Sequence, residues 1–212
     1  KNRQAIAQYA RQNHLQTERE LLRQTVAQKI TRAVYTKNQL QEVMTDFWFN
    51  HFNVSRTSNP ARPYILSYER DVIRPNALGG FRTLLGATAR HPAMLLYLNN
   101  AQSMAAADDP RLSHFAFGAL QGRANSKKPM GLNENYAREL MELHTLGVDG
   151  GYTQKDVTEV ARVLTGWTVA GGRRMGNRLE RLMEQNPDEV QQGENGFVFL
   201  PFLHDSGAKT IL

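Results

Sequence analysis

The chain has 212 residues, of which 41% are hydrophobic and 22% are charged, and it contains no cysteine. That length can bury one sizeable core, and the ordinary charged fraction argues against wholesale disorder. The lack of cysteine excludes disulfides, thiolate metal sites and thiol nucleophiles. No apolar run approaches the roughly 18 residues that would cross a bilayer, so we expect no transmembrane segment.

The net charge of +6 is confined to the beginning of the chain. Residues 1–37 contain eight Lys and Arg against two Glu, whereas the rest of the chain holds 18 charges of each sign. We therefore expect residues 1–36 to form a basic N-terminal helical segment. Such a segment usually marks a solvated face, and no nucleic-acid motif accompanies it, so nucleic acid is a disfavoured partner. An anionic partner or a membrane surface stays open.

Hydrophobic spacing predicts a mainly α-helical fold, with one multi-helix domain and long loops over residues 37–212. Helices are expected over residues 17–35, 36–52, 64–73, 81–89 and from Pro92 onward. Thr36 and Gln39 resemble a capping box at the start of the second helix. The third should end before Arg74-Pro75, because proline disfavours helical geometry in the preceding residue.

The helix at 36–52 carries the strongest periodic signal in the chain, a stripe of the kind that usually faces a core. Its members are Leu40, Val43, Met44, Phe47, Trp48, His51 and Phe52. Residues 99–130 read instead as a long surface loop.

The second half of the chain begins with a helix over residues 133–146 that Gly147 closes. Thr153 is placed to cap a further helix that runs to about Thr165. Residues 170–195 are rich in glycine and charge and look like a loop-rich insertion. At most a small β element is expected near 197–200.

Several stretches taken together resemble one bacterial family. They are Phe47–Phe52, Tyr68-Glu69, Ile73–Gly79, Asn133–Val148, Gly151–Gln154, Asp156-Val157, Leu164–Trp167, His204-Asp205 and Lys209-Thr210. On these motifs the chain is identified as a member of the family catalogued as domain of unknown function 1800, over most of residues 36–212. It departs from the family in its insertion, and it stops where further C-terminal helices are expected, as a fragment would.

The resemblance implies a mostly helical protein that is periplasmic or secreted, although no signal peptide stands in this chain. It also implies a sulfatase-like protein partner, because members are often encoded beside one. The family has no established activity, so no catalytic residue is carried over from it.

Candidate chemistry centres on the helix at 133–147. Glu139 and Glu142 form an i, i+3 carboxylate pair that could hold a divalent metal, with His51 and His204 as further ligands. Arg138 and Asp205 join Glu139, Glu142 and His204 as catalytic candidates. The alternative interpretation is structural: Glu134, Arg138 and Glu142 have the spacing of a helical ion-pair ladder.

His144 and the pair His204-Asp205 also have two interpretations. His144 lies on an apolar face and is expected to be a satisfied core histidine. His204-Asp205 resembles part of a metal-dependent phosphohydrolase signature, but Asp205-Ser206-Gly207 equally fits a turn.

Three functions follow from these patterns. The first is a helical binding or assembly component, the second a metal-assisted hydrolase beside the 133–147 helix, and the third a nucleic-acid binder using the basic N-terminal helix. The pocket of the second function depends on the helices at 133–147 and 153–165 packing antiparallel, with their polar edges facing one space, whereas the third function depends only on the charge of the N-terminal segment.

Overall fold

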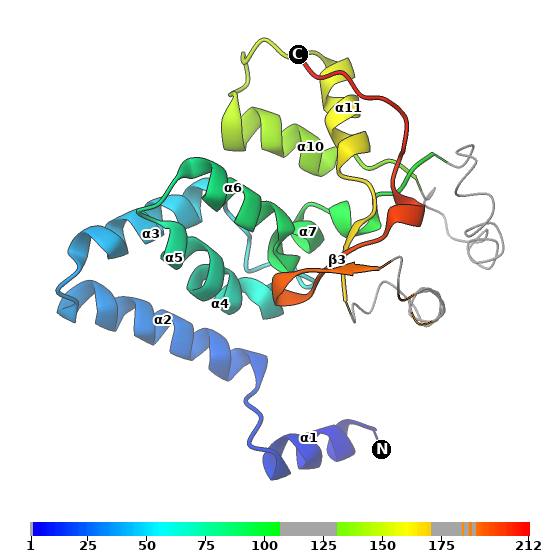
Figure 1. The fold of residues 1–212 in the computed structure, drawn as a ribbon. Helices are drawn as coiled ribbons and strands as arrows, with labels where there is room; N and C mark the ends of the chain where they lie inside the picture. Colours follow the sequence, from blue (N-terminus) through cyan, green and yellow to red (C-terminus); the bar gives the residue numbers. More distant parts are fainter. Residues whose placement is uncertain (1, 107–130, 171–183, 185–186, 188–189) are drawn as a thin grey trace.

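The computed structural model describes residues 2–106, 131–170, 184, 187 and 190–212. Helices form most of this part, and a small antiparallel sheet lies beside them, so the predicted fold class is confirmed (Figure 1). The longer helices are α1 (Asn2–Gln12), α2 (Glu18–Tyr35), α3 (Gln39–His51), α6 (Phe81–Arg90), α7 (Pro92–Tyr97), α10 (Asn135–Glu139) and α11 (Gln154–Val163). None of the described helices has the length and apolarity to span a membrane.

Helices α2 and α3 lie side by side at one end of the fold (Figure 1). Lys29 of α2 joins them: its Nζ is 2.5 Å from an Asp46 carboxylate oxygen and lies over the Phe49 ring. The predicted capping box at Thr36 is wrong, because the Gln39 side chain donates backwards to the carbonyls of Ala33 and Thr36. It therefore stabilises the end of α2 instead of the start of α3.

Only part of the periodic stripe on α3 faces the core. Phe52 is fully buried and Trp48 half-buried, whereas Leu40, Val43 and Phe47 are 64%, 61% and 53% exposed. These three residues are spaced i, i+3, i+7 and share the outward side of the helix. The periodicity predicted the helix correctly and its orientation only in part.

Phe52, at the end of α3, is where distant segments of the core meet. Its carbonyl accepts a hydrogen bond from the Tyr68 hydroxyl at 3.0 Å. Its ring lies 5.2 Å from that of His144 and 6.1 Å from that of Phe81, centroid to centroid. The core thus joins α3 to α6 and to the central helix through one aromatic side chain.

The helical segment after the first loop does not end before Pro75, contrary to prediction. It runs through η1 (Arg62–Tyr64), α4 (Ile65–Ser67), η2 (Tyr68–Ile73) and α5 (Arg74–Asn76). The segment η2 is a π-helical turn in which the Arg74 N–H bonds to the carbonyl of Glu69, five residues back. The wider turn makes room for the proline ring, which an α-helix would bring against a carbonyl.

The predicted central helix is present, but its second half departs from α geometry. Helix α10 continues directly into η5 (Leu140–Thr145), another π-helical turn, and the Leu146 N–H bonds to the carbonyl of Met141. Gly147 follows with φ +90°, as its terminating role predicted. Angular positions computed for a regular α-helix therefore do not hold beyond residue 139.

The start of the predicted surface loop at 99–130 is buried. Asn100, in the short turn η3 (Asn100–Gln102), and the following Ser103–Ala105 segment are at least 93% buried. The Asn100 amide donates to the carbonyl of Leu164 at 3.1 Å. This contact ties the segment to the end of α11, and residues 107–130 lie outside the described part.

The three-stranded sheet has the order β1-β3-β2 and is antiparallel throughout. Its strands are β1 (Trp167–Val169), β2 (Gln191–Gln192) and β3 (Phe197–Phe199), preceded by η7 (Glu194–Gly196) and followed by η8 (Pro201–Leu203). The β element predicted near 197–200 is confirmed, whereas β1 and β2 were not predicted. Most of the insertion predicted at 170–195 lies outside the described residues.

Gly166 connects α11 to β1 in a conformation that requires glycine. Its φ is +79°, and a Cβ there would lie 2.6 Å from the carbonyl oxygen of Leu200. We expect Gly166→Ala to lower the free energy of unfolding by about 2–4 kcal/mol, because it adds a clash to the strain of the left-handed conformation. Urea denaturation measures the loss.

Gly196→Ala is the matched control for this prediction. Gly196 has φ +84°, but nothing lies within 4 Å of its added Cβ. In Gly196→Ala the free energy of unfolding should fall only by the cost of the backbone strain, about 1–2 kcal/mol. Equal losses in the two variants would show that the approach of Leu200 does not matter.

Candidate functional site

The first turns of α10 and α11 are joined by polar side chains. Glu134 accepts hydrogen bonds from the Gln154 amide and the Thr158 hydroxyl, both at 2.7 Å. Arg138 donates to Gln154 at 2.7 Å and lies 3.6 Å from Glu134. An antiparallel pair would bring Glu134 to the end of α11, so the predicted antiparallel packing is wrong. The polar edges bond directly to each other.

Helix α11 begins as its sequence predicted. Thr153 and Asp156 form a complete capping box, in which each side chain bonds to the backbone N–H of the other. The Thr153 hydroxyl is the main cause that lowers the pKa of Asp156 to about 2. This capped turn fixes Gln154 and Thr158 opposite α10.

The four residues proposed to bind a metal are not brought together by the described structure. Glu139 and Glu142 are half-buried, and neither has a hydrogen-bond or ion-pair partner among the described residues. His51 contacts His144, whereas His204 contacts Thr165, just beyond the end of α11, and the ring of Phe199 in β3. Within the described ranges, no three His, Cys, Asp or Glu side chains are grouped so that they could hold a metal ion.

The ladder predicted along this helix is shorter than expected. The Glu134–Arg138 pair is present, but Glu142 makes no ion pair with the described residues. Glu142 stands within the π-helical turn, which rotates it away from its α-helical position.

His144 is buried, as predicted, but it is not satisfied. Its Nδ1 has no partner in the described structure, and the same is true of four other buried atoms: the Tyr136 hydroxyl, the Nε2 of His91, the Nε of Arg74 and the Oδ1 of Asn100. The carbonyl of His144 accepts a hydrogen bond from the Nε2 of His51 at 3.1 Å. Burial, with a smaller effect of His51, lowers the pKa of His144 to about 4, and burial also lowers the pKa of His91 to about 4.

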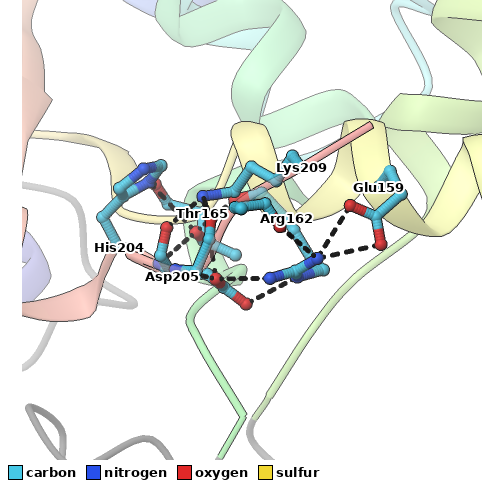
Figure 2. A network of polar contacts seen from close by, with 8 residues as sticks. Glu159, Arg162, Thr165, His204, Asp205 and Lys209 are labelled. Atoms are coloured by element: carbon cyan, nitrogen blue, oxygen red, sulfur yellow. Dashed lines mark hydrogen bonds and ion pairs between the residues drawn. The ribbon is translucent and has the colours of Figure 1, made fainter. Parts of the chain in front are cut away.

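An extended polar network lies where residues 204–212 run along α11 (Figure 2). The Arg162 guanidinium donates to both carboxylate oxygens of Asp205, at 2.8 and 3.0 Å, and to both of Glu159, at 2.8 and 2.7 Å. It also donates to the carbonyl of Ala208 at 3.2 Å. We call Glu159, Arg162 and Asp205 the Arg162 clamp.

Thr165 and Lys209 complete the attachment of this segment. The hydroxyl oxygen of Thr165 accepts a hydrogen bond from the backbone N–H of Asp205 at 2.8 Å. The Thr165 carbonyl accepts a second hydrogen bond from the Nδ1–H of His204 at 2.9 Å. Lys209 donates to the carbonyls of Asp205 and Gly207. The Gly207 N–H donates to the Asp205 carboxylate at 2.9 Å, so the turn predicted for Asp205-Ser206-Gly207 is confirmed.

The Arg162 clamp is built for attachment and not for proton transfer. The hydrogen bonds from Arg162 are the main cause that lowers the pKa of Asp205 to about 2, and the pKa of Arg162 is raised by its two carboxylate partners. A general acid or base works best with a pKa near the operating pH. Both groups stay charged at neutral pH and are already bonded to protein atoms.

Glu159 and Arg162 stand one turn apart on α11, but no sequence pattern indicated that Arg162 also pairs with Asp205. Asp205 is 43 residues away from Arg162 along the chain, and no spacing rule connects them. Thr165 was missed altogether, since a threonine at a helix end is a common residue with many uses. The only local signal was the i, i+3 spacing of residues 159, 162 and 165.

The fold and these contacts define a mainly α-helical protein with a small antiparallel sheet and a C-terminal segment fixed by the Arg162 clamp. The chain matches the family described as "Protein of unknown function (DUF1800)" over residues 1–212 and belongs to it. The match includes residues 1–35, for which no family motif was identified from the sequence. No curated protein and no solved structure matches the chain.

The two buried neutral histidines predict a loss of stability in mild acid. Their folded pKa of about 4 lies below the ordinary 6.5, so the unfolded chain binds more protons between these values. We expect the free energy of unfolding to fall with decreasing pH through this window, by about 1.4 kcal/mol per pH unit for each histidine. Urea denaturation at pH 7, 6, 5 and 4.5 measures this dependence on pH. His144→Gln should reduce the slope by the contribution of one histidine, about 1.4 kcal/mol per pH unit. An unchanged slope in that variant would contradict the assignment.

The Arg162 clamp predicts a specific cost of removing its arginine. Arg162→Met leaves the Glu159 carboxylate unpaired and leaves Asp205 with only the longer ion pair to Lys209, at 3.6 Å, so it should lower the free energy of unfolding by about 1–3 kcal/mol. It should also speed amide exchange at Gly207, whose acceptor Asp205 is released. Arg70→Met is the control, because the Arg70–Asp71 pair has a 62% exposed arginine and should cost less than about 1 kcal/mol.

Proposed function

We propose that this chain is a binding or assembly component that docks a partner protein through apolar side chains exposed on α2 and α3. The exposed large apolar residues of these two helices are Leu21, Val26, Ile30, Val34, Tyr35, Leu40, Val43 and Phe47. Single exposed apolar residues are ordinary, but a concentration of them on neighbouring helices is typical of an interaction surface.

Phe47 is the strongest candidate for an anchor of this surface. It is 53% exposed, yet its ring is stacked on that of His51 and packed edge-on against that of Trp48. Its position is therefore fixed before any partner arrives, which lowers the entropy lost on binding. Aromatic residues held in this way carry much of the energy of protein interfaces.

The alternative functions have less support. A metal-assisted hydrolase needs Glu139, Glu142, His51 and His204 to converge, and no contact among the described residues joins them. A nucleic-acid binder would depend on the basic charge of residues 1–37 alone. A sulfatase-like partner and a periplasmic or secreted location, implied by the family resemblance, stay predictions.

A photo-crosslinking residue tests this proposal directly. With benzoylphenylalanine in place of Val43 or Ile30, we expect one protein adduct to form in the native host, identified by mass spectrometry. Adding Leu40→Gln and Phe47→Gln should reduce the yield of this adduct by at least tenfold, because both remove apolar contact area. Thermal denaturation checks that these variants stay folded.

The control position is Asp149, which is exposed in the turn after η5. Benzoylphenylalanine there should give no adduct with the same protein. Equal adducts at Asp149 and Val43, or none at Val43 and Ile30, would contradict docking through α2 and α3. Glu142→Ala and His204→Ala should leave the adduct unchanged, since neither residue lies on this surface.

A further inference from the structure

We infer that the outward side of α2 binds a helix whose short apolar centre is bordered at both ends by carboxylates. This inference rests on the proposed function and adds the chemistry of the partner. The residues concerned, which we call the α2 seam, are Arg19, Arg23, Val26, Ile30, Ala33 and, just beyond the helix, Lys37.

The α2 seam has the spacing of a helix–helix contact. Its members within the helix follow one another at intervals of 4, 3, 4 and 3 residues, the pattern by which helices pack along one line. Val26 and Ile30 are 43% and 61% exposed, and Ala33 is also exposed. Lys29, which contacts Asp46 and Phe49 of α3, lies beside this line, so the seam is not used in that contact.

Basic groups border the seam at both ends. Arg19 and Lys37 are exposed and have no ion-pair partner among the described residues. Arg23 pairs with Glu20, but the Arg23 side chain remains 76% exposed and such surface pairs contribute little. The centre between Arg23 and Lys37 spans about 20 Å at helical rise. Carboxylates at both ends of a partner helix of similar length would complement this charge.

A second copy of this chain fits the seam poorly. In a parallel pair, Arg19 and Arg23 would face the same arginines, and Lys37 would face Lys37. In an antiparallel pair, the arginines of one copy would face Lys37 of the other. Both orientations bring like charges together, which is unfavourable at a helix interface.

Lipid and nucleic acid also fit less well than a protein helix. The centre of the seam consists of Val, Ile and Ala, with none of the Trp or Phe that anchor helices in a membrane interface. It offers no aromatic ring on which a base could stack, and its apolar length would face phosphates. Small aliphatic side chains suit close packing against another helix.

The inference is tested with three synthetic helical peptides of equal length and the same Leu/Ala core. They carry Glu, Gln or Lys at both ends, and fluorescence anisotropy measures their affinity for the full chain. We expect the Glu peptide to bind about tenfold more tightly than the Gln peptide at 50 mM salt, with most of this advantage lost at 0.5 M salt. The Lys peptide should bind most weakly.

Two sets of variants separate charge from apolar contact. Arg19→Gln, Arg23→Gln and Lys37→Gln together should remove the preference for Glu but keep the affinity for the Gln peptide. Ile30→Gln should weaken all three peptides by at least fivefold. All four positions are exposed, so circular dichroism should find the helix content unchanged.

Each other outcome overturns the inference. Equal affinity for the Glu and Gln peptides would rule out an acidic partner helix without contradicting docking through α2 and α3. If no peptide binds and the Val43 adduct still forms, the α2 seam is not a helix-binding site, and the proposed function is not contradicted. Dimerisation that Ile30→Gln abolishes assigns the seam to a second copy, and tighter binding to phosphatidylserine vesicles or duplex DNA than to the Glu peptide assigns it to those partners.

Discussion

The burial of Phe52 at the end of α3 is the contact on which the described fold depends most. Its backbone carbonyl and its ring are used by different parts of the chain, Tyr68 on one side and His144 and Phe81 on the others. Because α3 is fixed here by its inward side, Leu40, Val43 and Phe47 are left facing solvent. The exposed surface that carries the proposed function is therefore a consequence of how the core is built.

Much of the helical framework follows from local sequence rules. The cap at Thr153, the terminator at Gly147 and the turn at Asp205 were predictable because each depends on residues within a few positions. The strand at Phe197–Phe199 was predictable from its composition. These features require no knowledge of what the segment packs against.

The features that sequence patterns did not predict depend on distant partners. Pro75 indicated a helix end, but the π-helical turn at 68–73 accommodates it, and Gln41 of α3 donates to the carbonyl of Arg74. The proposed metal site failed to assemble for a similar reason. His51 and His204 were chosen as ligands for their chemistry, and the fold bonds each to a different carbonyl.

The π-helical turns at 68–73 and 140–145 have a further consequence for how the chain can vary in length. Each accommodates one more residue per hydrogen-bonded ring than an α-helix does. Deleting one residue there would let the helix close into α geometry while the segments on either side keep their orientation, whereas a deletion within a regular α-helix rotates everything beyond it by about 100°. Single-residue length differences among related chains are therefore expected at these two turns, where the backbone already accommodates an extra residue, and not within α6 or α11.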